Sequence, residues 1–548
     1  MRINIINGII AIVAISTIIL TGCSKDKNLL SEQTEGPSKT SYSEPADEMI
    51  LGNKIDNPYS VANMSIAYSN LINKANNGKI NAKIDQNVVI ETTHLYIRIK
   101  PQDSTEYQYL IDKSGLELFT YPLDYEIIQL GNYYECPNLA PGEFPYFYTS
   151  VHIKEVSQIQ LKFETLEECY IPDENEIGEE TAFLLELEAM LVPELITVLE
   201  YDEALNNRGS KRPEGYIKVK NTSTKKYEGV KKIKIRVHNV VKWDAVYTNE
   251  DGYYKMDKSW LTQVHYAAIF ENSTGFKIWG NCAFFAPANY QMGWHTNSGH
   301  SRDFDTGSQG WLWSAINNAA YIYREKMCPD YNISKPPSDL RVWAYKMNGE
   351  YDGCAPMARR FPFSNTNFIL FLQKHNVTVQ LNYILLLMPD IFILQDFKNT
   401  KKCYAAVFHE LAHASHFQKA TANYWKHYVN ATINNGAYGN ATDPLAGFIG
   451  IGEIWGYYIE WKCMNNKVKL GFTEFEDVPL DETVEWFKPK LIKELEVSRG
   501  LSVKQIFDCL KWDIYTCGKL KTELINAYAS NNPTLQTKII NAFNSYGF

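Results

Sequence analysis

Two histidines with a glutamate beside the first are the residues best suited to chemistry in this chain. His409 and His413 stand four residues apart, and Glu410 follows the first of them. On a helix, positions i and i+4 lie one turn apart on the same face, so both imidazoles can reach one ion. Zinc readily accepts such nitrogen ligands, and the intervening glutamate can take the proton of a zinc-bound water. The spacing therefore predicts a zinc site with Glu410 as general base.

A helical wheel of residues 404–417 supports this prediction. One side collects mostly apolar residues: Tyr404, Val407, Phe408, Leu411 and Ser415. His409, His413 and His416 fall on the opposite side, with Glu410 at its edge. An apolar stripe would hold the helix against a core while the histidines face a cleft. The alternative is a helix whose histidines bind nothing.

A third protein ligand is expected elsewhere, because zinc in a hydrolase usually has three protein ligands and one open position. His416 lies about 10.5 Å beyond His409 along the helix axis, which is too far to share the ion. We expect it to support the ligands or to face the substrate.

Glu453 is the predicted third ligand. It stands on a largely apolar helix that follows a glycine-rich lead, where burial of a carboxylate is costly unless it is paired or bound to metal. The alternatives are an acid stabilised by the helix dipole at the start of that helix, or Asp443 as ligand. Gly456 and Glu460 share its face. Gly456 would permit close approach to the metal helix, and Glu460 would orient a ligand imidazole.

The oxyanion of a hydrolytic reaction also needs a hydrogen-bond donor. Tyr438 and Tyr457 are the candidates we assign as catalytic, with His416 and His427 as further possibilities. Each of these residues alone is more often structural.

The pattern His-Glu-x-x-His followed by a glutamate on a later helix resembles the gluzincin metallopeptidases. The resemblance implies His409, His413 and Glu453 as zinc ligands and Glu410 as general base. The Asn-Glu-x-x-x-Asp form of the thermolysin-like group is absent from the sequence. The whole chain also resembles zinc-peptidase-like lipoproteins of Gram-negative bacteria.

The first 23 residues are typical of a lipoprotein signal peptide. Arg2 is followed by an apolar run, which ends in Leu-Thr-Gly-Cys at Cys23. By resemblance to the bacterial lipobox, Cys23 would carry the lipid anchor. Ser24 gives no signal for retention at the inner membrane, so the outer membrane is expected, facing either the periplasm or the cell surface. A plain secretory signal is the alternative.

Four further segments are predicted after the signal peptide. Residues 24–48 are polar and indicate a flexible tether. Residues 49–207 alternate between helical and strand patterns, which predicts an N-terminal α+β domain without chemistry of its own. Residues 208–279 show repeated strand patterns with a turn into Gly252-Tyr-Tyr, and they resemble the carboxypeptidase-regulatory-like, transthyretin-like β-sandwich. Residues 280–548 would form a zincin-like α+β catalytic domain. The expected fold class is thus multidomain α+β.

Composition narrows the function further. The formal net charge of −9, without a basic stripe, argues against a nucleic-acid partner. Nine cysteines remain after Cys23, with no Cys-x-x-Cys pair, so a thiolate zinc site is not expected.

Three functions remain open from the sequence. The first is a membrane-anchored zinc endopeptidase acting on a protein or peptide. The second is a surface adhesion or glycan-associated lipoprotein with a degenerate zincin domain, and the third is a structural metal site without turnover. Substrate and oligomeric state are not indicated by the sequence.

Overall fold

The computed structural model describes residues 44–548, apart from 81–83, 138, 140–142, 208–209, 281–285, 348–352, 361–388, 436–437 and 472–476. The predicted signal peptide, Cys23, most of the predicted tether and Cys282 therefore lie outside the described residues. The same is true of residues 378–388 within the apolar stretch before the metal helix.

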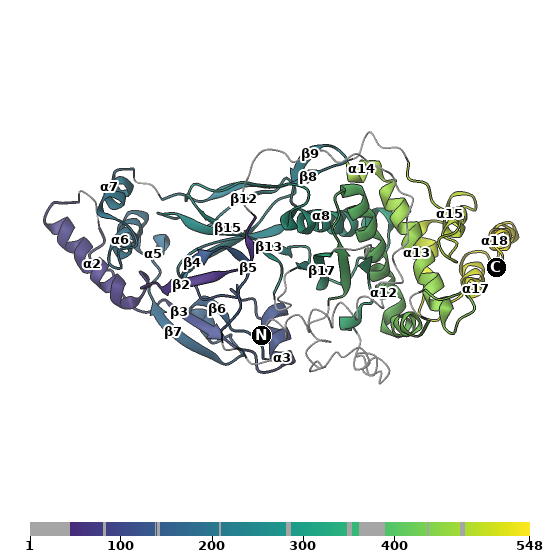
Figure 1. Ribbon diagram of the computed structural model, residues 1–548, viewed down its shortest axis with the longest axis horizontal. Coiled ribbons are helices and arrows are strands. Elements are labelled where there is room, and N and C mark those ends of the chain that lie inside the picture. The colour runs from purple at the N-terminus through teal and green to yellow at the C-terminus, as the bar shows by residue number, and fades with distance from the viewer. Residues whose placement is uncertain are drawn as a thin grey trace.

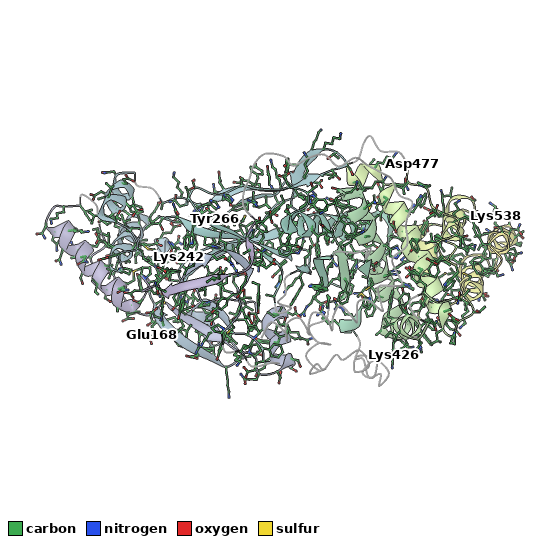
Figure 2. The ribbon with its side chains drawn as sticks, in the orientation of Figure 1. Glu168, Lys242, Tyr266, Lys426, Asp477 and Lys538 are labelled. Atoms are coloured by element: carbon green, nitrogen blue, oxygen red, sulfur yellow. The ribbon has the colours of Figure 1, made fainter. Side chains whose placement is uncertain are left out.

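The protein is a mixed α+β, multidomain structure, as predicted. Figure 1 shows an elongated molecule with the N-terminal elements at one end, sheets in the middle and helices at the C-terminal end. Exposed lysines such as Lys426 and Lys538 lie on the outside of the C-terminal helices (Figure 2).

The N-terminal region combines small sheets with helices around its own hydrophobic core. Its strands pair as β1 with β5, β2 with β4, and β6-β3-β7. They span β1 Ala46–Glu48, β2 Ile50–Lys54, β3 His94–Ile99, β4 Tyr125–Gln129, β5 Gly131–Tyr133, β6 Phe147–His152 and β7 Phe163–Cys169. Its helices are α2 Val61–Asn76, α3 Ser104–Asp112, α4 Ile153–Val156, α5 Glu174–Ile177, α6 Glu179–Leu191 and α7 Val198–Asn207.

The middle of the molecule contains two larger sheets. The four-stranded sheet has the order β12-β8-β16 with β9 on β8, and the eight-stranded sheet has the order β11-β10-β13-β14-β17-β19-β18 with β15 on β13. The strands are β8 Glu214–Asn221, β9 Lys226–Gly229, β10 Ile233–Asn239, β11 Lys242–Tyr247, β12 Tyr253–Lys255, β13 Val264–Asn272, β14 Phe276–Trp279, β15 Asn289–His295, β16 Arg302–Phe304, β17 Leu340–Met347, β18 Gly353–Cys354 and β19 Ile391–Gln395.

The larger sheet continues past the boundary predicted at residues 279 and 280. Strand β14 pairs in parallel with β17, so that Phe276 lies opposite Leu340. One hydrophobic core also extends from Ile217 to Phe543. Strands between residues 208 and 279 therefore share a sheet and a core with the segment that carries the histidines.

The C-terminal part is helical. Helix α8 continues through a π-helical turn, η1, into α9, and a 3₁₀ turn, η2, precedes the long helix α12. The elements are α8 Gln309–Ile322, η1 Tyr323–Met327, α9 Cys328–Tyr331, η2 Ala358–Arg360, α12 Thr400–Asn435, α13 Ala446–Met464, α14 Lys467–Leu470, α15 Lys490–Val497, α16 Val503–Asp508, α17 Cys517–Tyr528 and α18 Pro533–Ser545. Helices α12 and α13 pack against each other and form the scaffold of the site.

Candidate metal centre

Helix α12 presents the two histidines as the spacing predicts. It begins at Thr400, where the Asn399 side chain accepts a hydrogen bond from the Lys402 amide at 3.1 Å and so caps the first turn. Its apolar side, with Phe408 as one member, is buried in the main core. His409 and His413 are 5% and 1% exposed, so the imidazoles lie inside the protein.

Helix α13 begins at Ala446, which differs from the turn predicted for its glycine-rich lead. The glycines are helical, and they allow close packing: a Cβ at Gly452 would lie 2.9 Å from the ring of Tyr428. Glu453 is consequently the eighth residue of α13 and not part of its first turn. The helix dipole acts mainly within the first turn, so it does not account for this buried carboxylate.

Gly456 brings the two helices together at the histidines. A Cβ at this position would lie 2.9 Å from His413 Cε1 and 3.0 Å from His409 Cε1. Real Cβ atoms do not approach that closely, so only glycine fits without displacing the imidazoles. The close approach expected of Gly456 is present in the structure.

The two helices bring together His409, His413 and Glu453, all buried, with one ligand atom of each within 4.8 Å of the others. The Nε2 atoms of the histidines are 3.1 Å apart. Glu453 Oε2 lies 3.3 Å from His409 Nε2, and Oε1 lies 3.3 Å from His413 Nε2. Zinc ligands at 2.0–2.1 Å in a tetrahedron are separated by roughly 3.3 Å, which is close to the separation of the two nitrogens and of each nitrogen from its nearer carboxylate oxygen.

Protonation of these groups also favours a cation between them. His409 Nδ1 lies 3.2 Å from Glu460 Oε2, which assigns the proton of the neutral ring to Nδ1. His409 Nε2 then turns a lone pair toward the carboxylate of Glu453 and toward His413 Nε2. These groups repel one another unless a positive charge lies among them, and a divalent ion or a proton can supply it.

The pKa values follow the same electrostatics. Burial lowers the pKa of His409, but hydrogen bonds and charge from Glu453 and Glu460 outweigh burial and raise it well above its usual range. Burial opposes ionisation of Glu453, yet the two histidines hold its pKa well below the usual range. The pKa of His413 is lowered, by burial and by its neighbour His409. A metal would compete with a single proton, held mainly on His409.

Glu460 occupies the place predicted for it, beside His409 Nδ1. Carboxylates that accept from the outer nitrogen of a ligand histidine set the tautomer and the ring orientation. Within the described residues, the ion pairs of Glu453 and Glu460 are made with these histidines.

Glu410 lies at the margin of the histidine face of α12. Its side chain packs against β18, the outermost strand of the eight-stranded sheet. It is 2% exposed, and a Cβ at Gly353 would lie 3.1 Å from Glu410 Cγ. Burial raises the pKa of the neighbouring Cys354 thiol, and the charge of Glu410 raises it further. The edge of the eight-stranded sheet thus lies directly beside the proposed base.

The other predicted residues have different positions. Tyr438 donates to Glu453 Oε2 at 3.1 Å, and the ring of Tyr457 stands edge-on to His409 with centroids 4.5 Å apart. His416 does not face a cleft: it is fully buried against Tyr424 and Trp425. Its pKa is lowered to about 3, first by burial and then by His413.

Two further residues considered at the sequence level lie away from the ligand atoms. The ring of His427 packs on Phe448, with centroids 4.9 Å apart. Asp443 Oδ2 accepts from the Asn440 amide at 2.6 Å, in the turn that leads into α13. Neither residue belongs to the group that could hold a metal.

Tyr428 is a residue that sequence reasoning missed. Its hydroxyl donates to Glu453 Oε1. It lies in the second half of α12, beyond a break at Thr421, whereas a straight helix would carry it about 22 Å along the axis from His413.

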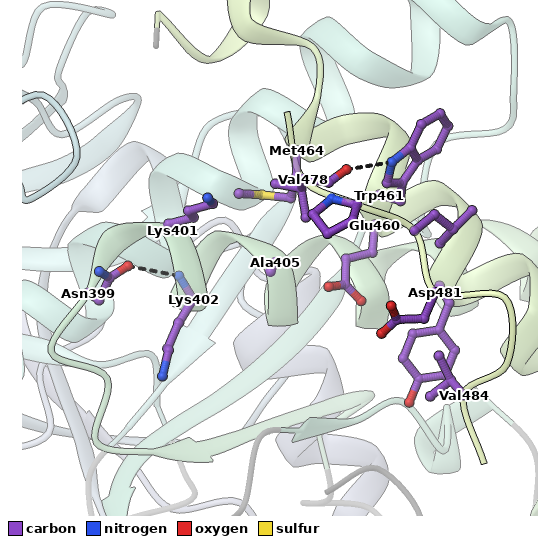
Figure 3. Close-up of a pocket in the computed structure, with 13 residues that line it drawn as sticks. Asn399, Lys401, Lys402, Ala405, Glu460, Trp461, Met464, Val478, Asp481 and Val484 are labelled. Carbon is purple, nitrogen blue, oxygen red and sulfur yellow. Dashed lines mark hydrogen bonds between the residues drawn. The ribbon is translucent and has the colours of Figure 1, made fainter. Parts of the chain in front are cut away.

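A pocket of about 80 Å³ borders the site on the Glu460 side. Figure 3 shows the carboxylates of Glu460 and Asp481 directed into it, with Lys401 and Lys402 at the opposite end. Tyr457 lies between this pocket and His409, so the pocket adjoins the ligand group.

Comparison with known proteins gives no identification. The chain matches no family model and no curated protein. The resemblances to gluzincins, to the β-sandwich family and to lipoproteins therefore remain predictions that rest on the motifs alone.

Two other findings bear on the sequence predictions. None of the described helices is long and apolar enough to cross a membrane. In the part of the chain that the structure describes, eight cysteines are free and buried. They are Cys136, Cys169, Cys328, Cys354, Cys403, Cys463, Cys509 and Cys517.

Proposed function

We propose that this protein is a metal-dependent hydrolase, most specifically a zinc peptidase anchored to a membrane by its lipidated N-terminus. The observation that carries the proposal is the buried group of His409, His413 and Glu453, whose spacing fits a zinc face. The donor set of two imidazoles and one carboxylate also matches catalytic zinc sites, which keep one position open.

The residues around this group supply the remaining roles. A bound divalent metal would provide Lewis acidity for water activation and for polarisation of a scissile carbonyl. Glu410, next to a ligand on the same helix, takes the proton from the attacking water and returns it to the leaving amine. Glu460 accepts from His409 Nδ1 and so leaves Nε2 as the ring nitrogen that would hold the ion.

The position of Glu410 supports a peptide as substrate. Its side chain lies against Gly353 of β18, at the edge of a sheet. An extended peptide can add to such an edge through backbone hydrogen bonds, which would bring its carbonyl groups near Glu410.

Metal content and hydrolysis together test the proposal. We expect the purified protein to carry about one zinc per chain, as three-ligand sites do, and Glu453→Ala to lose it. Glu410→Gln should keep the metal while hydrolysis of an unstructured protein substrate falls by about 10²–10⁴-fold. A wild-type chain that binds no zinc after reconstitution would contradict the proposal, and so would undiminished hydrolysis by Glu410→Gln.

Ligand binding without turnover is the alternative, and one cavity favours it. A hollow of about 820 Å³ lies between α7 and the larger sheet, bordered by Trp294, Asn239 and Gln263. Trp294 is 40% exposed, and a fixed aromatic face beside amide groups suits a saccharide. Titration with soluble oligosaccharides, followed by tryptophan fluorescence of wild type and Trp294→Ala, tests this function separately.

A further inference from the structure

The third member of the candidate metal centre, Glu453, lies in the apolar first half of helix α13. It is fully buried, and Ile454 and Trp455 beside it are buried as well. A carboxylate without compensating partners is costly in such a place. Its partners therefore decide whether it is ionised and in position before a metal arrives.

Two tyrosine hydroxyls donate hydrogen bonds to Glu453, one to each carboxylate oxygen. Tyr428 donates to Oε1, and Tyr438 donates to Oε2 at 3.1 Å. Oε1 also faces His413 Nε2 and Oε2 also faces His409 Nε2, each at 3.3 Å. Each oxygen thus accepts one O–H and turns toward one imidazole, so the carboxylate cannot rotate without breaking a hydrogen bond.

The tyrosines reach Glu453 because α12 is not one regular helix. Thr421 has φ of 68° and ψ of 173°, a region almost reserved for glycine and costly for a β-branched residue. The chain changes direction there, and the following segment packs back on the site. Tyr428 lies against Gly452, where a Cβ would be 2.9 Å from its ring.

Tyr438 is held from the opposite side. Its ring stands edge-on to Phe487, with centroids 4.8 Å apart, and its backbone oxygen accepts from Trp486 Nε1 at 3.3 Å. The two hydroxyls therefore come from separately supported segments: Tyr428 from α12, and Tyr438 from the connection between α12 and α13.

We propose that Tyr428 and Tyr438 are positioning residues that hold Glu453 ready as the third metal ligand. Their hydroxyls replace the water that burial removes, and they direct one oxygen toward each imidazole. This inference rests on the metal site of the proposed function. In this proposal Tyr438 orients the Glu453 carboxylate, and it does not stabilise the oxyanion as the sequence predicted.

Zinc affinity of the full-length protein tests the inference, measured by competition with a chromophoric chelator. Loss of a group that orients a ligand typically weakens metal binding by about 10–100-fold, so we expect that loss for Tyr428→Phe and for Tyr438→Phe. Each substitution keeps the ring and removes only the hydroxyl. The double variant should bind more weakly than either single variant.

Tyr424→Phe is the matched control. Tyr424 lies one turn before Tyr428, is also buried, and donates its hydroxyl to the Phe448 carbonyl at 2.6 Å and not to Glu453. We expect its thermal stability to fall while zinc affinity stays at the wild-type level. In a Glu453→Ala background, Tyr428→Phe should leave the residual zinc affinity unchanged, because its partner is already absent.

The possible outcomes distinguish failure of the tyrosine inference from failure of the proposed metal site. A wild-type protein that binds zinc, with equal affinity in Tyr428→Phe and Tyr438→Phe, would overturn this inference and leave the proposed metal site standing. Equal losses in all three tyrosine variants would also overturn it, since they would reflect general loosening of the helix. A wild-type protein that binds no zinc would overturn the proposed function and this inference with it.

Discussion

Two buried histidine pairs in this protein show what distinguishes a candidate metal centre from ordinary packing. The rings of His409 and His413 have centroids 4.7 Å apart, and those of His238 and His265 are 5.0 Å apart. All four histidines are less than 10% exposed. Neither proximity nor burial therefore separates the two pairs.

The charges around the pairs do separate them. His238 and His265 lie opposite each other on β10 and β13, and Arg236 on β10 is near both. Burial lowers the pKa of His265 to about 3, and the positive charge of Arg236 adds to that effect. Among the described residues, no third ligating side chain joins this pair.

His409 and His413, the candidate metal ligands, have the opposite environment. The carboxylates of Glu453 and Glu460 raise the pKa of His409 in spite of burial. Imidazoles next to carboxylates attract a cation, whereas imidazoles next to a guanidinium repel one. The comparison shows that nearby carboxylates, more than the histidines themselves, indicate which histidine pair can hold a metal.

The largest effect is expected from Gly456→Ala. This substitution should leave His409 and His413, like His238 and His265, as a buried pair that cannot bind a metal. The added methyl group would lie 2.9–3.0 Å from both imidazole rings, so the helices must separate or the rings must turn. We expect bound zinc to fall from about one per chain to background, measured by atomic emission. Gly518→Ala in α17 is the control, because the nearest atom lies 3.9 Å from its Cβ. It should keep the metal, and unchanged zinc in Gly456→Ala would contradict the prediction.

A smaller effect is expected when one carboxylate is neutralised. Glu460→Gln removes the charge that faces His409 Nδ1, and zinc affinity should fall by about 10–100-fold in a chelator competition. Glu496→Gln is a matched control, since Glu496 bonds to Tyr458 and Lys462 of the same helix. That variant should lose stability without losing zinc affinity. Equal affinities of Glu460→Gln and wild type would remove Glu460 from the site.

The smallest effect concerns the other pair, His238 and His265. His265 has a folded pKa of about 3 and an ordinary unfolded value near 6.5, so between these values the unfolded chain binds more protons. Stability is therefore lost as pH falls below about 6.5. His265→Phe should reduce the loss between pH 7.5 and pH 5 by about 2 kcal/mol, measured by urea unfolding. The same pH dependence in both proteins would show that the pKa of His265 is the same in the folded and the unfolded chain.

Much of the site could be predicted from the sequence because helical periodicity alone places these residues on one face. The spacing of His409, Glu410 and His413 requires only a helix, and an acid on an apolar helix identifies Glu453 and Glu460. The helix boundary at Ala446 was not predicted, since glycines usually indicate a turn. Here they serve close packing, which depends on the neighbouring ring of Tyr428.

The orientation of His416 was also not predictable. A helical wheel places it with the other histidines, but Tyr424 and Trp425 cover it. These residues follow the break at Thr421, whose φ and ψ no threonine would adopt without tertiary support.

The sequence by itself determined which residues share a helix face, because that follows from 3.6 residues per turn. It indicated the α+β class and the group that could hold a metal. Only the tertiary structure decided the partners that come from distant segments. The two tyrosines on Glu453, the edge strand beside Glu410 and the sheet that crosses residue 279 all depend on contacts between chain segments far apart, and such contacts leave no periodic signal in the sequence.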